Sequence, residues 1–391
     1  MEQKPYILEE YKEDLQRCMC CGLCRSLCPT YSLKGWESGS PRGRVQILKA
    51  LLEGGIKENA FVMDRIYSCA LCGYCLWRCP SGVRTTDAFK AARALLVEKG
   101  IYPKVIEIVE ANILQTHNLY GFKKLPRNET IESMKAGAAK KPWDRREGIV
   151  YFPGCVTSFT KEGSEIAKAS AYILDEAGLA WTTLGEEEWC CGNPLILSGK
   201  ILHAKDFALH NSEAIGRLGA KTLVTSCAGC YRTFSQEYPR LIGSLGFQVL
   251  HITQLIEFLL SAGKLHMDME AALPLRATYH DPCELGRHSK VYEPPRNILK
   301  AIKGLELKEG ARNRSTTACC GGGGILRFTD PEGSMEIGAR RLREAQALGV
   351  EALISACPTC KLNLSETASK ANIGLRILDV TEVVAKAIGK K

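Results

Sequence analysis

The hydrophobic pattern of the first hundred residues predicts helices separated by cysteine-rich loops. Apolar Val45, Leu48 and Leu52 recur at helical spacing, after a Ser-Pro opening and before a Gly-Gly pair that ends the pattern. Residues 88–99 show the same periodicity and are followed by another glycine. We therefore expect residues 1–100 to form a mainly helical domain.

Beyond residue 148 the pattern changes to short apolar runs that alternate with amphipathic segments. This alternation is typical of βαβ units on a mainly parallel sheet, so the predicted fold class is α/β with a helical N-terminal domain. The strand-like runs read IVYF, KTLVT, QVLHI, ATYH, EALIS and LRILDV. The stretch 101–147 is rich in lysine and has little apolar periodicity, and we expect it to be a connector.

The α/β half of the chain repeats itself. The offset between corresponding cysteines stays almost constant, which predicts two copies of one unit, residues 148–272 (repeat 1) and 273–391 (repeat 2). Each copy should form one lobe of a pair with pseudo-twofold symmetry. The corresponding cysteines are Cys155 and Cys283, Cys190 and Cys319, and Cys227 and Cys357.

Composition excludes several classes of protein. With 391 residues, of which 45% are hydrophobic and 24% charged, the chain has a globular composition and is neither disordered nor fibrous. No run of about 18 apolar residues could span a bilayer, and the first residues do not form a secretory signal. We therefore expect a cytoplasmic protein.

The 19 cysteines change the picture, because thiols in a reducing compartment stay free and bind metals. The formal net charge of +9 counts these thiols as neutral. A metal site deprotonates its thiols and carries negative charge, so the basic balance is weak support for nucleic-acid binding. We predict no nucleic-acid partner.

Two cysteine runs near the N-terminus have the spacing C-x2-C-x2-C-x3-C-P. In such runs three cysteines bind one 4Fe-4S cubane, while the fourth reaches the other cluster of a pair. Zinc ribbons are the alternative, since C-x2-C pairs also hold zinc. Cys20 lies outside this spacing, either as a small packed residue or as an alternative ligand. The predicted ligand sets are Cys18, Cys21, Cys24 and Cys79, and Cys69, Cys72, Cys75 and Cys28.

Each repeat contains one cysteine, then an adjacent pair followed by glycine, then C-x2-C. Five thiols are too many for a tetrahedral zinc or a simple cubane, and adjacent cysteines suit a thiolate that bridges two irons. Four of the cysteines end predicted strands, where ligands of open α/β sheets collect. The run Gly321–Gly324 could instead be a phosphate loop, but no phosphate-binding motif accompanies it. The two sets are Cys155, Cys190, Cys191, Cys227 and Cys230, and Cys283, Cys319, Cys320, Cys357 and Cys360.

This constellation resembles the CCG-domain family of iron-sulfur oxidoreductases, and within it the heterodisulfide reductase catalytic subunits of the fused type. The resemblance implies that each five-cysteine set holds a noncubane 4Fe-4S cluster and that a disulfide is reduced between the two. The chain would then be a disulfide-reductase-like enzyme whose substrate is a small-molecule disulfide or thiol. Without a flavin or nicotinamide motif, it would receive electrons from a cytochrome b or a flavoprotein partner, through which alone it would reach a membrane.

The iron-sulfur subunits of flavin-dependent glycolate, lactate and glycerol-3-phosphate dehydrogenases also resemble this layout. In that reading the chain only transfers electrons. Many of those subunits have incomplete C-x2-C elements, whereas CAGC and CPTC are both intact here. The complete motifs favour the reductase branch.

Several basic side chains lie close in sequence to the CCG cysteines. A histidine could donate a proton during disulfide reduction, and an arginine could bind an acidic substrate. The alternative is that these side chains are satisfied locally or solvated, since a basic residue near an anionic cluster needs no substrate to explain it. The candidates are His280 and His288 for the proton, and Arg287, Arg232, Arg327 and Lys361 for the anion.

Overall fold

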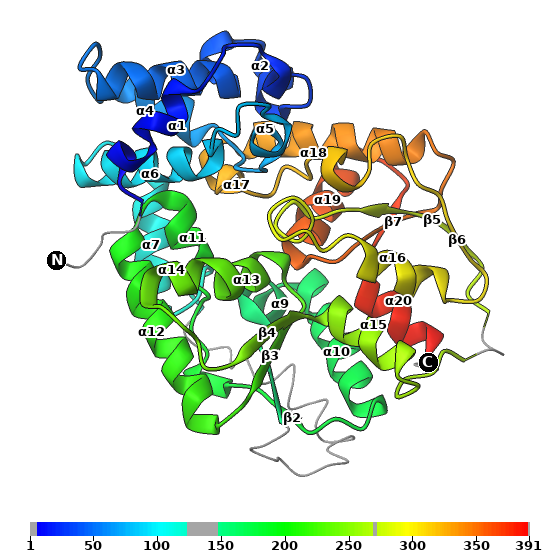
Figure 1. Ribbon diagram of the computed structural model, residues 1–391. Coiled ribbons are helices and arrows are strands. Elements are labelled where there is room, and N and C mark those ends of the chain that lie inside the picture. The colour runs from blue at the N-terminus through cyan, green and yellow to red at the C-terminus, as the bar shows by residue number, and fades with distance from the viewer. Residues whose placement is uncertain (1–5, 123–147, 269–271, 390–391) are drawn as a thin grey trace.

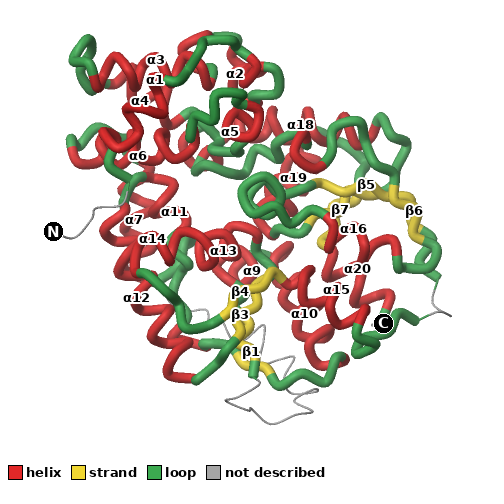
Figure 2. The backbone as a smooth tube through the Cα atoms, in the orientation of Figure 1, coloured by secondary structure: helices red, strands yellow, loops and turns green. Residues whose placement is uncertain are grey.

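The computed structural model describes residues 6–122, 148–268 and 272–389. Figure 1 shows a helical N-terminal part, in blue, above two α/β units in green and in yellow to red. In Figure 2 the strands form two separate groups, each surrounded by helices. No helix within the described ranges is both long and apolar enough to cross a membrane.

The N-terminal part is built from short helices joined by cysteine loops. Ser40 begins α3, because its hydroxyl accepts a hydrogen bond from the Gly43 amide at 2.9 Å and Pro41 takes the first helical position. Helix α6 is buried along most of its length, so the other helices and repeat 1 pack around it. The helices are α1 (Lys12–Gln16), α2 (Pro29–Lys34), α3 (Pro41–Leu52), α4 (Ala60–Tyr67), α5 (Tyr74–Arg78), α6 (Thr85–Glu98) and α7 (Val105–Thr116).

Repeat 1 contains a parallel sheet in the order β2-β1-β3-β4. Its strands are β1 (Ile149–Tyr151), β2 (Trp181–Thr182), β3 (Thr222–Thr225) and β4 (Gln248–His251). Its helices are α9 (Gly154–Phe159), α10 (Lys161–Glu176), α11 (Asn193–Ser198), α12 (Ile201–Leu218), α13 (Ala228–Arg232), α14 (Tyr238–Ile242) and α15 (Ile252–Ser261).

Repeat 2 has the equivalent strand order, β6-β5-β7-β8, and is also parallel. Both repeats end on a capped helix, since His251 caps α15 and Asp379 caps α20 through a capping box. The strands are β5 (Leu275–His280), β6 (Leu305–Leu307), β7 (Ala352–Ser355) and β8 (Arg376–Asp379). The helices are α16 (Glu293–Lys300), α17 (Leu326–Thr329), α18 (Pro331–Gln346), α19 (Pro358–Lys370) and α20 (Val380–Ala387).

Three hydrophobic clusters among the described residues hold the three parts together. One joins the N-terminal helices to repeat 1, and another runs continuously through both repeats, where α10 packs against α20. A smaller one joins the N-terminal part to repeat 2 and consists of Ala70, Cys72, Tyr74, Cys319, Leu326 and Ile337. The apolar strands have buried side chains, as expected for parallel sheets covered on both faces. This packing fixes the carboxyl ends of the strands in both repeats relative to one another.

The predicted fold class is confirmed: a helical N-terminus precedes two parallel sheets of equal strand order. The sequence pattern did not predict strands β2 and β6, because they are only two and three residues long and partly exposed. The predicted connector 101–147 is described only as far as residue 122 and contains α7 there. Residues 123–147 lie outside the described residues.

Candidate metal centre

The CCG cysteines of both repeats converge on one cavity of about 230 Å³, which we call the cleft. All of the ten except Cys319 line it, although they come from distant parts of the sequence. The convergence follows from the topology, since Cys227 and Cys357 come two residues after the ends of β3 and β7, and Cys155 and Cys283 follow β1 and β5. Equivalent strands therefore bring equivalent thiols to the cleft from two sides.

The thiols form a continuous line across the cleft. In repeat 1, Cys190 and Cys191 lie within hydrogen-bonding reach of Cys155 and Cys230 respectively. In repeat 2, Cys320 lies beside Cys319 and Cys360 in the same way. The two repeats meet where the thiols of Cys227 and Cys357 are within hydrogen-bonding reach of each other.

The residues around this line fit a thiolate-bound cluster. The donors in each repeat are five thiols, which is the ligand chemistry that iron-sulfur clusters require. Gly154 has φ +76°, and a Cβ there would lie 2.8 Å from the Cys230 sulfur. Gly321 has φ +86°, and a Cβ there would lie 2.1 Å from the Ser334 carbonyl oxygen. Only glycine lets the backbone turn this close to the ligands.

Burial disfavours free thiolates in the absence of metal. It raises the pKa of Cys283 and of Cys75 well above the ordinary value, and it raises the pKa of Cys24 to about 11. Cluster binding must therefore displace protons from these thiols. Such pockets suit metal ligands better than solvent-exposed reactive cysteines.

The two ferredoxin-type runs exchange their fourth cysteines. Cys79 lies near Cys18 and lines the same small pocket as the first run. Cys28 lies near Cys72 and Cys75 of the second run. This placement agrees with the ligand sets expected from the spacing, whose role as ligands stays a prediction.

The two cluster loops differ in their surroundings. Cys21 of the first run is exposed, and the neighbouring Cys20 faces Gln46, whose amide donates to its sulfur at 3.3 Å. Cys69, Cys72 and Cys75 of the second run are buried. One loop thus faces solvent and the other faces the rest of the protein.

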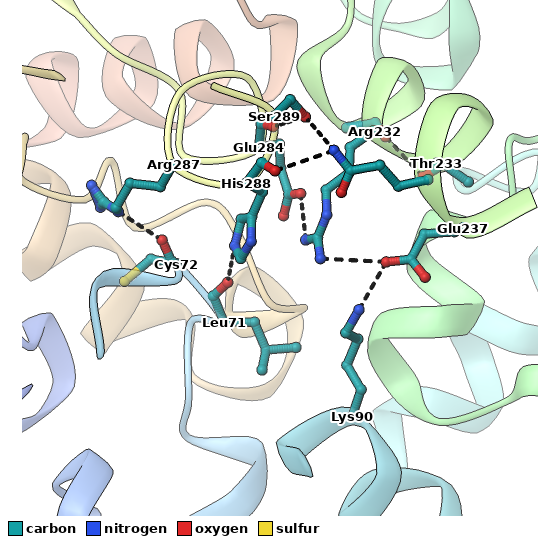
Figure 3. A network of polar contacts seen from close by, with 12 residues as sticks. Leu71, Cys72, Lys90, Arg232, Thr233, Glu237, Glu284, Arg287, His288 and Ser289 are labelled. Atoms are coloured by element: carbon teal, nitrogen blue, oxygen red, sulfur yellow. Dashed lines mark hydrogen bonds and ion pairs between the residues drawn. The ribbon is translucent and has the colours of Figure 1, made fainter. Parts of the chain in front are cut away.

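The buried loop, residues 69–75, docks on repeat 2 next to the CCG ligands. The thiol of Cys72 lies within hydrogen-bonding reach of the Cys319 thiol, and a Cβ on Gly324 would meet the Ala70 carbonyl carbon at 2.4 Å. In Figure 3, Arg287 reaches the carbonyl oxygen of Cys72, at 2.9 Å, and His288 that of Leu71, at 3.0 Å. The loop therefore continues the line of thiols from the N-terminal part into repeat 2.

These contacts correct two sequence interpretations. Arg287 is not available as an anion clamp, because it donates to the carbonyl oxygens of Cys72 and Thr317. It is also not solvated, since only 4% of it is exposed. The His288 ring donates its N–H to the carbonyl oxygen of Leu71. Burial lowers the pKa of this imidazole well below its usual value, which keeps it neutral.

The other basic candidates have separate partners. Lys361 donates to the carbonyl oxygen of Glu162 and pairs with Glu382 at 2.8 Å. Arg232 pairs with Glu284 at 2.7 Å. Arg327 lines the cleft and also contacts Glu366 at 2.9 Å. Of the lining side chains that the structure describes, Glu284 and Arg327 are the charged ones.

Sequence reasoning missed the buried arginine that joins all three parts of the molecule. Arg93 on α6 donates to the carbonyl oxygens of Cys69 at 2.7 Å, Leu197 at 2.6 Å and Gly324 at 2.9 Å. It is fully buried. Its position four residues after Phe89 on an apolar helix face was the available signal, because a charge on such a face must be satisfied by tertiary partners.

A second missed group is a buried ion-pair network between the N-terminal part and repeat 1. Lys90 Nζ lies 2.8 Å from Glu237 Oε1, and Arg232 lies 3.3 Å from the same oxygen (Figure 3). Burial alone would raise the pKa of Glu237, but Lys90 and Arg232 lower it to about 2. Tyr6 also donates its hydroxyl to this carboxylate. No local motif signals the network, since Lys90 and Tyr6 are more than a hundred residues away from Glu237 in the sequence.

Comparisons with known proteins agree with this architecture. The cysteine-rich CCG domain family matches residues 149–235 and 277–365, and a 4Fe-4S dicluster domain family matches residues 14–83. One subunit of the dihydromethanophenazine:CoB–CoM heterodisulfide reductase of Methanosarcina barkeri is 34% identical, with 96% of this chain and 94% of that protein covered. The corresponding subunit from Methanosarcina acetivorans matches with the same identity and coverage.

More distant relatives share the layout. One subunit of the fumarate reductase (CoM/CoB) of Methanothermobacter marburgensis is 28% identical over 97% of this chain and 74% of that protein. A solved structure of a hypothetical protein from Helicobacter pylori has a TM-score of 0.63 at 12% identity, and the match covers 99% of this chain and 74% of that one. That structure shares the fold. From its two CCG repeats, its dicluster domain and its near full-length match to the Methanosarcina proteins, this chain belongs to the family of CCG-domain heterodisulfide reductase subunits.

Proposed function

We propose that this protein is the catalytic subunit of a disulfide reductase and that the reaction takes place in the cleft between the two CCG repeats. The observation that carries this proposal is the convergence of nine thiols from two complete five-cysteine motifs on one cavity. A pure electron relay needs only a chain of clusters within electron-transfer distance. Two facing cysteine sets would in addition allow one electron to be delivered to each sulfur atom of a disulfide. The named activity of the Methanosarcina relatives supports the same reaction class.

We assign a 4Fe-4S cubane to each ferredoxin-type cysteine set and a noncubane 4Fe-4S cluster to each CCG set. Bound clusters would supply one-electron transfer. The reaction breaks the S–S bond, consumes two electrons and two protons, and releases two thiols. The electrons come from a partner of the cytochrome b or flavoprotein type, because the chain has no flavin or nicotinamide motif of its own.

The side chains of the cleft would bind and orient the disulfide. Apolar Leu119, Val156 and Phe328 line it beside the cysteines, so the substrate would enter a site largely free of competing water. Glu284 and Arg327 offer polar contacts for the ends of the substrate.

The test is a turnover assay on anaerobically purified protein with reduced methyl viologen as the one-electron donor and a panel of low-molecular-weight disulfides. We expect oxidation of the dye that depends on at least one disulfide and yields two thiols per two electrons. A fully loaded protein that reduces none of them, yet accepts electrons from a flavoprotein dehydrogenase, would instead be an electron-transfer subunit of a flavin-dependent dehydrogenase.

A further inference from the structure

The two CCG repeats differ at one position beside their cluster ligands. His280 is the last residue of β5, three residues before Cys283, and Phe152 stands three residues before Cys155 in repeat 1. Both side chains are buried. Equivalent positions therefore present a polar ring in repeat 2 and an apolar ring in repeat 1.

The His280 ring faces the sulfur ligands of repeat 2. Its ring nitrogen and the sulfurs of Cys320 and Cys360 all lie within 4.8 Å of one another. His280 does not line the cleft, so it stands behind these ligands and away from the space where a substrate would bind. A role as proton donor to the substrate does not suit this placement.

Contacts on the other side of the ring fix which nitrogen carries the hydrogen. Arg341 donates its Nε–H to His280 Nδ1 at 3.4 Å, so Nδ1 is the acceptor and Nε2 bears the hydrogen. Among the described residues, Nε2 has no hydrogen-bond partner, sulfur atoms included, although it is fully buried. A buried N–H of this kind needs an acceptor.

Repeat 1 offers nothing comparable at the equivalent place. Phe152 packs edge-on against Phe234, with ring centroids 4.8 Å apart. A Cβ on Gly154 would touch both the Cys230 sulfur, at 2.8 Å, and the Phe152 ring, at 3.6 Å, so this ring stands beside the ligands as His280 does in repeat 2. The ligands of repeat 1 therefore face a ring that donates no hydrogen bond.

We propose that His280 is a positioning residue whose Nε2–H donates a hydrogen bond to sulfur of the repeat 2 cluster and raises its reduction potential above that of the repeat 1 cluster. The physical basis is that a hydrogen bond to sulfur stabilises the extra negative charge of the reduced form. The first electron from the donor then resides on the repeat 2 side, which is also the side that the loop 69–75 contacts. This inference rests on the proposed assignment of a cluster to each repeat.

The experiment is an anaerobic redox titration followed by electron paramagnetic resonance, without substrate. We use the Cys191→Ala background to remove the repeat 1 signal, so that the repeat 2 cluster gives the remaining signal from the CCG repeats, and compare His280 with His280→Phe and His280→Gln. We expect equal iron content in all three, a lower midpoint potential with phenylalanine, and a potential near that of wild type with glutamine, which retains an N–H at a similar reach. The reciprocal Phe152→His, in the Cys320→Ala background, should raise the potential of repeat 1.

An unchanged potential in His280→Phe would overturn the inference, as would loss of repeat 2 iron, which would make His280 a ligand. Because the readout needs no substrate, a shifted potential in a protein that reduces no disulfide would sustain the inference while the proposed function fails. Absence of iron from the CCG repeats of the wild-type protein would overturn both. If Phe152→His fails to bind iron, the phenylalanine and glutamine variants of His280 still decide the question.

Discussion

The two CCG repeats have equivalent sets of cysteines and differ in the residues that surround them. Both have the same strand order and an equivalent set of five thiols. Cys319 of repeat 2 faces Cys72 of the N-terminal part, whereas the equivalent Cys190 of repeat 1 donates its amide to the carbonyl oxygen of His117 at 2.8 Å. A duplicated unit thus keeps its set of five cysteines, while its environment depends on what each copy packs against.

The contacts of the two repeats with the N-terminal part that Figure 3 shows also differ in chemistry. Repeat 1 uses the buried charges of Glu237 and Arg232 around Lys90. Repeat 2 uses Arg287 and His288 to bind backbone carbonyl groups of the cluster loop. The strength of an ion pair changes with pH and with the loss of either charged partner, whereas the strength of a hydrogen bond to the backbone depends mainly on its geometry. Substitutions should therefore weaken one attachment without weakening the other.

The largest effect on stability should come from Arg93→Met, which removes the side chain shared by both attachments. The change leaves buried carbonyl groups of Cys69, Leu197 and Gly324 without their donors, so we expect the free energy of unfolding to fall by about 4 kcal/mol. Anaerobic thermal denaturation measures the loss. Arg340→Met, at a partly exposed side chain that pairs with Glu336 on the same helix, should change stability by less than about 0.5 kcal/mol and serves as the control. Equal midpoints for the two variants would contradict the role of Arg93.

Glu237→Gln should weaken the attachment to repeat 1 with a defined pH dependence. Removing one partner of this buried network should cost about 3 kcal/mol at neutral pH. The pKa of Glu237 is lowered from 4.5 to about 2, so its contribution is fully present above the unfolded value and is lost as the pH falls through the folded value. The stability difference between wild type and variant should be constant above pH 4.5 and shrink below it. A difference that grows on acidification would refute this account.

The smallest effect should come from Cys20→Ser. Cys20 and Leu71 occupy the same place in the two ferredoxin-type runs and share a positive φ, of 54° and 48°. Because leucine occupies this place in the second run, we infer that the first run does not need a thiol there. The iron content of Cys20→Ser should therefore equal that of the wild type. Cys21→Ser, made in parallel, should lose a cubane or convert it to a three-iron form. Equal iron loss in both variants would show that the ligand register is wrong.

The sequence sufficed for features that depend on local spacing. Strand ends, amphipathic helices and cysteine spacing placed the CCG thiols at the carboxyl edges of two equivalent sheets, because each feature is encoded within a few residues. The contacts that Arg93 makes with Leu197 and Gly324, and that Glu237 makes with Lys90, were out of reach, because these partners lie more than a hundred residues away in other parts of the chain. His280 was identified as a candidate, but only the geometry shows that its ring points at ligands and not into the cleft.

The central claim is that both CCG repeats take part in breaking the disulfide. The most direct test is disulfide turnover by Cys191→Ala and Cys320→Ala with reduced methyl viologen, with the reduction of the ferredoxin cubanes followed in the same samples. We expect each variant to lose disulfide reduction while the cubanes stay reducible, because each substitution removes a ligand from one side of the cleft. If either variant keeps most of the wild-type turnover, the two-sided mechanism is wrong and the protein is better described as an electron relay.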